Sequence, residues 1–188
     1  MKKSVIFAIF LFLISLLCFS SCSMEPTIPD NSNTFSKYKD NMELFDACVQ
    51  DLNGIEYDCL ISRTDYYAPE GSEDFLGLYI QNMDDLSCHE YENSHVETLI
   101  EVCDVKLFDV VHVEELFICA FDMCVPGRNY DYGIYYVSED QPIYLGDPAK
   151  SLVQNGNGYS YEQPADYGAK FTFYTEKITE HFYYYEIY

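Results

Sequence analysis

The sequence predicts an α+β fold in which N-terminal helices pack on a curved antiparallel β-sheet. Between residues 35 and 52, apolar residues recur every three or four positions, which is the period of a helix with one buried face. Later segments are rich in β-branched and aromatic residues, and turn-forming Gly, Pro and Asn separate them. Helices that precede a series of strands, without alternating with them, favour α+β over a parallel α/β sheet.

The clearest helix is expected over residues 35–52. Its apolar stripe is formed by Phe35, Tyr38, Met42, Phe45, Val49 and Leu52. Asn53-Gly54 is expected to end it, because Gly readily takes the left-handed conformation. Ser72 is expected to cap a second helix, whose apolar face would contain Phe75, Leu76, Tyr79, Met83 and Leu86. Asp147-Pro148 predicts the start of a third, short helix that stops at Asn155-Gly156.

Six segments have the composition of strands. They are residues 55–61, 98–107, 115–124, 132–137, 170–178 and 182–188. The last two are expected to pair as a terminal hairpin. Because residues 182–188 are apolar on both faces, we expect this strand inside the sheet and not at its edge.

This order of elements is similar to that of the cystatin-like and NTF2-like folds. In both, helices come first and an aromatic strand lies near the C-terminus. The resemblance implies a curved sheet that wraps a long N-terminal helix. A sheet of that shape would offer a pocket or an exposed face to a ligand.

The first 21 residues have the pattern of a secretory signal. Lys2 and Lys3 precede an apolar run over residues 5–17, and small residues follow it. The apolar run is shorter than the roughly 20 residues of a membrane-spanning helix. The positive start favours the cytoplasmic side, so the rest of the chain is expected outside the cytoplasm.

The end of this leader, Phe19-Ser20-Ser21-Cys22, resembles the lipobox of bacterial lipoproteins. The resemblance implies that residues 1–21 are removed and that Cys22 receives a diacylglyceryl group, which carries two acyl chains such as palmitate. Such chains anchor a protein stably in the cell membrane, here at its extracytoplasmic face. Cleavage to a soluble secreted protein and retention as an uncleaved anchor are the alternatives.

Three regions follow from this interpretation. Residues 1–21 are the signal peptide, residues 22–34 are the lipidated cysteine and a flexible tether rich in small polar residues and Pro, and residues 35–188 are a single α+β domain. Removal of the leader takes away two of the ten basic residues and none of the 32 acidic ones, which leaves a net charge of −24. Nucleic acid is therefore excluded as a partner, because phosphate binding needs clustered Lys and Arg.

Six cysteines remain beyond Cys22. They are Cys48, Cys59, Cys88, Cys103, Cys119 and Cys124. In an exported protein they permit three disulfides in 15 connectivities, which the sequence does not distinguish. Cys48 and Cys119 lie in apolar stretches, where a free thiol acts as a small hydrophobic side chain.

The sequence holds only fragments of known catalytic and metal motifs. His112-Val113-Glu114 matches the first half of a zinc deaminase signature, but the second half is missing. Cys88, His89, His95 and Cys103 are residue types that bind zinc, but their spacing matches no familiar finger. We therefore expect no metal and no cofactor, and the catalytic residues, if any exist, stay unassigned.

A non-catalytic domain that binds an extracellular protein, glycan or cation is the function we expect, with the lipid as its only contact with the membrane. One alternative is an envelope hydrolase that uses Asp or Glu as general acid and base. Another is an acidic inhibitor or immunity-type protein, whose charge attracts a basic target. The 19 Tyr and 13 Phe, with no Trp, suit both sheet packing and a binding surface.

Overall fold

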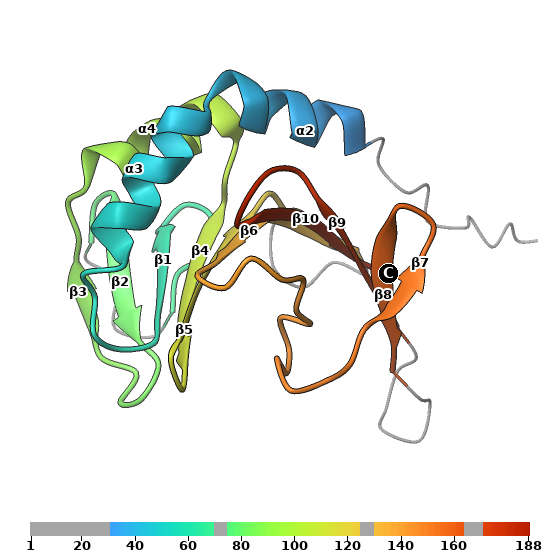
Figure 1. The fold of residues 1–188 in the computed structure, drawn as a ribbon. Helices are drawn as coiled ribbons and strands as arrows, with labels where there is room; N and C mark the ends of the chain where they lie inside the picture. Colours follow the sequence, from blue (N-terminus) through green and yellow to red (C-terminus); the bar gives the residue numbers. More distant parts are fainter. Residues whose placement is uncertain (1–30, 70–74, 125–129, 164–170) are drawn as a thin grey trace, which may run out of the picture.

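The computed structural model describes residues 31–69, 75–124, 130–163 and 171–188. These residues form three helices and one antiparallel sheet of ten strands (Figure 1). The α+β class predicted from the sequence is therefore confirmed. Within the described ranges, no helix is long and apolar enough to cross a membrane.

The helices are α2 (Asn31–Asp40), α3 (Met42–Leu52) and α4 (Ser94–Cys103). The strands are β1 (Cys59–Arg63), β2 (Leu78–Asn82), β3 (Cys88–Glu90), β4 (Leu107–Val113), β5 (Leu116–Asp122), β6 (Asp131–Val137), β7 (Val153–Asn155), β8 (Gly158–Glu162), β9 (Thr172–Lys177) and β10 (Phe182–Ile187). Their order in the sheet is β3-β2-β1-β4-β5-β6-β10-β9-β8-β7. The C-terminal strand lies between β6 and β9, as its two apolar faces predicted.

The long N-terminal helix of the sequence prediction is two helices. Its chain breaks at Asn41, where φ is −131° and ψ is 23°, and the Asn41 side-chain amide donates to the carbonyl of Lys37 at 2.8 Å. Asn competes for backbone partners in this way, which makes it a poor residue for a helix interior. Because α2 begins at Asn31, residues 31–34 of the predicted tether are helical.

Two segments have the opposite secondary structure to the one predicted: a predicted helix is a strand, and a predicted strand is a helix. Ser72, the predicted cap of the second helix, lies outside the described residues. The helix predicted after it is wrong over residues 78–82, because Leu78–Asn82 forms β2 and pairs with β1 along its whole length. The strand predicted over 98–107 is wrong for most of its length, because Ser94–Cys103 forms α4. Asn93 caps this helix, since its side-chain oxygen accepts the amides of His95 and Val96, both at 3.0 Å.

The third predicted helix is also absent, because residues 142–152 contain no helix. The Asp147 side chain accepts the amide of Ala149 at 3.1 Å, which makes a local turn and not a helix cap. Asn155-Gly156 does not end a helix but opens the turn of the β7–β8 hairpin, with Gly156 at φ +60°. The strands predicted over 115–124, 132–137 and the terminal hairpin are confirmed as β5, β6, β9 and β10.

The sheet buries apolar side chains on both of its faces. The helices cover one face, where Phe45 of α3 packs on Phe121 and Phe182. The opposite face carries a second core, in which loop 138–152, orange in Figure 1, places Ile143 against Tyr135 and its neighbours. Between this loop and the sheet lies the pocket described next.

Candidate functional site

A pocket of about 310 Å³ lies on the sheet face that the helices do not cover. We call it the sheet-face pocket. It is lined by Leu107, Asp109, Ala120, Asp122, Cys124, Asp131, Leu145, Gly146, Tyr185 and Ile187. These side chains come from β4, β5, β6 and β10 and from loop 138–152. The pocket therefore combines three carboxylates and a phenol with apolar walls.

Strand alternation explains why these residues meet. Asp109 on β4 lies opposite Ala120 on β5, and Asp122 is two residues farther along β5 on the same face. Such diagonal neighbours on adjacent strands are typically about 7–8 Å apart. Asp122 also lies opposite Gly133, and Gly133 lies opposite Tyr185, so the three form a row across β5, β6 and β10.

Gly133 is the residue that allows this row to close. The Tyr185 hydroxyl donates a hydrogen bond to Oδ1 of Asp122, across the strand to which Gly133 belongs. A Cβ atom at position 133 would lie 3.0 Å from Cε1 of the Tyr185 ring and 2.2 Å from the carbonyl oxygen of Phe121. The missing side chain therefore lets the tyrosine ring pass over β6 and reach the carboxylate.

Both aspartates on β4 and β5 hold their protons more tightly than a solvated carboxyl group. Burial raises the pKa of Asp109 to about 6, and the charge of Asp58 adds to this. Burial also raises the pKa of Asp122 to about 7; the Tyr185 hydrogen bond opposes the shift, while Asp109 and Asp131 reinforce it. Among the described residues that line the pocket, none is basic. The carboxylates therefore face each other without a cation from the chain.

The thiol at the pocket rim is not poised for nucleophilic catalysis. Cys124 donates to Oδ1 of Asp131 at 3.4 Å, and burial raises the pKa of its thiol to about 12. A thiol is a nucleophile only as the thiolate, which this pKa disfavours at neutral pH. None of the four histidines lines the pocket. His112, for example, lies 3.3 Å from Asp58, a residue that is not among the lining residues.

Loop 138–152, which forms one wall, is held in place by tyrosine hydroxyl groups. The Tyr135 hydroxyl accepts the Ile143 amide at 3.1 Å and contacts the Ile143 carbonyl at 3.3 Å. Asp140, near the start of the loop, accepts the Tyr183 hydroxyl at 3.0 Å and the His181 amide at 2.9 Å. These bonds keep the wall in position without a ligand, so the pocket is preformed.

Tyrosine is a frequent hydrogen-bond partner of carboxylates in this sheet, and at Asp140 it acts together with Lys177. Besides the Asp122 and Asp140 contacts, Glu186 accepts the hydroxyls of Tyr130 and Tyr184, at 3.0 and 2.9 Å. The chain has only ten Lys and Arg for 32 acidic residues. The high tyrosine content therefore serves both sheet packing and the hydrogen bonding of acidic side chains.

Two other pockets among the described residues do not combine several carboxylates without a basic residue. The one of about 450 Å³ beside β7 and β8 is lined by Ser151, Val153, Ser160, Tyr161 and Glu162, and it holds a single carboxylate. The one of about 210 Å³ beside α4 contains Arg63 together with Glu97 and Glu101, so its charges are partly matched. We therefore take the sheet-face pocket as the candidate site.

The residues of the fragmentary metal motifs do not come together. Cys88 and His89 lie on the edge strand β3, while His95 and Cys103 lie near opposite ends of α4, about 12 Å apart along its axis. Within the described residues, no three or more His, Cys, Asp or Glu side chains lie close enough together to hold a metal ion. Nor does any disulfide join cysteines there, and Cys48, Cys59, Cys103 and Cys119 are buried. Cys22 lies outside the described residues.

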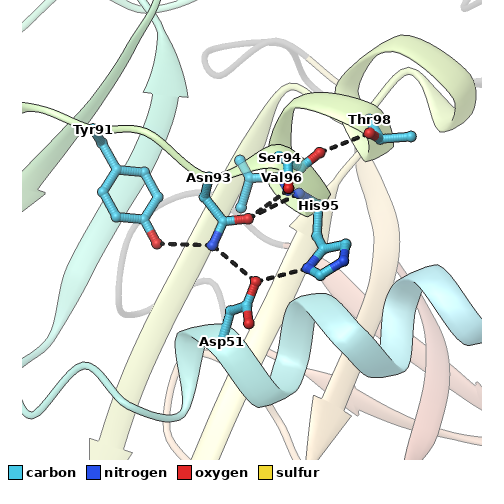
Figure 2. A network of polar contacts seen from close by, with 7 residues as sticks. All are labelled: Asp51, Tyr91, Asn93, Ser94, His95, Val96 and Thr98. Carbon is cyan, nitrogen blue, oxygen red and sulfur yellow. Dashed lines mark hydrogen bonds and ion pairs between the residues drawn. The ribbon is translucent and has the colours of Figure 1, made fainter.

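His95 instead belongs to a network that joins α3 to α4 (Figure 2). Oδ2 of Asp51 accepts a hydrogen bond from the Asn93 side-chain amide at 3.0 Å and lies 2.8 Å from Nδ1 of His95. Asn93 also caps α4, so one residue both starts this helix and connects it to the end of α3. The contacts account for these polar side chains as structural groups. Comparison with known proteins adds no assignment, since no family model, curated protein or solved structure matches this chain.

Proposed function

We propose that the chain is a membrane-anchored extracytoplasmic lipoprotein whose sheet-face pocket binds a small organic cation without converting it. The observation that carries the proposal is the lining of the pocket. Asp109, Asp122 and Asp131 face one preformed space in which no basic residue neutralises them. A cationic group of a ligand would supply the charge that is missing.

The apolar walls narrow the class of ligand. Leu107, Leu145 and Ile187 line the same space as the carboxylates. Small-molecule sites commonly combine such apolar surface with a few polar groups that orient the ligand. A volume of about 310 Å³ is at the lower end of the range for such sites. An amine or guanidine on a compact aliphatic or aromatic body fits this description best.

Calorimetry with benzylamine, and with benzyl alcohol as the neutral ligand of similar shape, tests this function on the full chain in detergent. We expect benzylamine to bind and benzyl alcohol not to bind. Asp109→Asn should weaken benzylamine binding at least about tenfold, because it removes a charge next to the ligand. Asp40→Asn, which removes an exposed charge at the end of α2, is the matched control and should have no effect. Equal binding of both ligands would contradict the cation proposal.

A second function, acid–base hydrolysis, is favoured by one specific observation. Asp122, with a pKa of about 7, is about half protonated at neutral pH, and Asp109 beside it is mostly ionised. A neutral and an ionised carboxyl group in one pocket are the pair that hydrolysis of a glycosidic bond requires. Release of nitrophenol from a panel of nitrophenyl glycosides, abolished by Asp122→Asn and by Asp109→Asn, would replace the first proposal with this one.

The membrane anchor is the part of the proposal that the leader supports. Phe19-Ser20-Ser21-Cys22 resembles a lipobox, and α2 begins at Asn31, so residues 22–30 can span at most about 30 Å between lipid and domain. Metabolic labelling with a palmitate analogue tests it. Cys22→Ala should abolish incorporation, and Cys18→Ala, which removes a cysteine that follows two leucines, should not. Incorporation that persists in Cys22→Ala would refute the anchor.

The finer fold assignment, a cystatin-like or NTF2-like arrangement, also remains a proposal. Its support is the order of elements, with helices first and an aromatic strand last. The break at Asn41 differs from the single long helix of those folds. An experimental structure of the domain, superposed on members of both folds, would test the assignment.

A further inference from the structure

The turn between β2 and β3, residues 82–87, exposes apolar side chains at the edge of the sheet. We call this turn the β2–β3 tip. Leu86 is 60% exposed and Met83 is 42% exposed. None of residues 82–87 lines the sheet-face pocket, and β1 separates β2 from β4. The tip is therefore not part of that pocket.

Leu86 occupies a backbone conformation that does not suit it. Its φ angle is +60°, in the left-handed region where Gly and Asn are at ease and a branched aliphatic side chain is strained. The side chain recovers only part of this cost from burial, since 60% of its surface is exposed. Folding alone would favour Gly at this position. Strain of this kind, kept at an exposed position, is typical of a residue that serves an interaction.

Hydrogen bonds hold the tip in one shape. The amide of Asn82 donates to the carbonyl of Ser87 at 2.9 Å, and the amide of Met83 donates to the carbonyl of Asp58 at 2.9 Å. Two side chains close the turn itself: Asn82 accepts the amide of Asp84 at 2.8 Å, and Asp85 accepts the amide of Ser87 at 2.9 Å. The apolar groups are therefore presented by a preorganised turn, which lowers the entropy lost on binding.

The charge around the tip specifies the partner. Asp84 and Asp85 are exposed between Met83 and Leu86. The chain contains no Lys or Arg between residues 64 and 105, nor between residues 40 and 62, so only Arg63 interrupts a long acidic region. The exposed acidic pair of the tip repels anionic lipid headgroups and nucleic acid. It attracts a basic protein surface and accelerates encounter with it.

We propose that the β2–β3 tip docks onto a partner protein that carries an apolar recess within a basic surface, and that Leu86 is the anchor. Leu86 and Met83 fill the recess, and Asp84 and Asp85 contact the basic residues around it. The partner is encountered outside the cytoplasm, where the proposed anchor holds the domain.

A photo-reactive amino acid at position 86 of the full chain, expressed in the producing cells, tests the proposal. Position 76 is the control, because Leu76 is 94% exposed at the other end of β2 and does not have a positive φ angle. We expect one protein adduct from position 86 and none from position 76, and the adduct should be a protein of basic isoelectric point. No adduct, the same adduct from both positions, an acidic protein or a lipid adduct would each overturn the proposal.

Once that partner is purified, substitutions can separate the contribution of Leu86 to binding from that of the two aspartates. Leu86→Ala should weaken binding at least about tenfold, because it empties the recess. Asp84→Asn combined with Asp85→Asn should slow association and reduce its dependence on salt, with a smaller effect on dissociation. Leu86→Gly should bind as weakly as Leu86→Ala but unfold at least about 2 °C higher, because it relieves the left-handed strain. Unchanged affinity in Leu86→Ala would overturn the anchor.

Discussion

Replacement of Asp122 by Asn should change how the stability of the domain depends on pH. In the folded protein the pKa of Asp122 is about 7, whereas an ordinary aspartate has 3.8. Between these values the native carboxyl group keeps its proton while the unfolded one has lost it. The unfolded state then binds fewer protons, so stability must fall as the pH rises from about 4 to about 7.

The structure allows the size of this effect to be worked out. Each pH unit in that interval contributes about 1.4 kcal/mol, so the full interval corresponds to about 4 kcal/mol. Asp122 lines an open pocket and is only partly buried by area, and solvent reduces the figure to about 2 kcal/mol. Asn keeps the shape of the side chain and cannot ionise, so this part of the pH dependence should vanish in Asp122→Asn.

Urea unfolding followed by circular dichroism, at intervals between pH 4 and pH 8, measures the effect. The quantity to compare is the difference in unfolding free energy between wild type and variant, because the general repulsion of a chain of net charge −22 changes both. Asp40→Asn is the control and should run parallel to wild type. If Asp122→Asn also runs parallel to wild type, the carboxyl group has an ordinary pKa, and the electrostatic description of the sheet-face pocket is wrong.

Three other substitutions test other parts of the structure. Asn93→Ala should lower stability by about 1 kcal/mol, because two amides of α4 lose their cap, and Asn93→Asp should restore most of it. Gly133→Ala should lower the thermal midpoint by several degrees, because its Cβ would lie 2.2 Å from a carbonyl oxygen, whereas Gly54→Ala, with a nearest atom at 3.4 Å, should not. Asp140→Asn should destabilise the domain at neutral pH and less so near pH 2. The hydrogen bonds to Lys177 and His181 lower the pKa of Asp140 to about 2. The stability that the ionised carboxylate contributes is therefore lost as the pH falls toward that value. Unfolding curves that match wild type would contradict each expectation.

Local sequence patterns correctly predicted those elements in which the spacing of apolar residues along the chain matches the side chains that the fold buries. Phe45, Val49 and Leu52 form one helical stripe, and all three are buried in α3. Residues 182–188 are apolar on both faces, and β10 lies inside the sheet. The broken helix at Asn41 could have been suspected from the residue type, because Asn satisfies backbone groups locally.

Such patterns are ambiguous in residues 78–82 and 94–103, where helix and strand were predicted the wrong way round. Leu76, Tyr79 and Met83 recur at a helical spacing, but pairing of residues 78–82 with β1 decided for the strand. In α4, residues of high β propensity such as Val96 and Ile100 are buried against the helix-covered core, so packing outweighed propensity. The cap at Asn93 and the helical spacing of Val96, Leu99, Ile100 and Cys103 are the local signals that could have identified this helix.

The sequence by itself determined the α+β class and the excess of carboxylates. Only the tertiary structure decided that Asp109 and Asp122 lie on one face of the β4–β5 hairpin, and that Asp122 meets Tyr185, which lies 63 residues beyond it and reaches it across Gly133. The physical reason is that strand alternation is a local property of the chain, whereas the order of strands depends on pairing between distant segments. That pairing set β10 beside β6, and it made a pocket from residues that no spacing in the sequence connects.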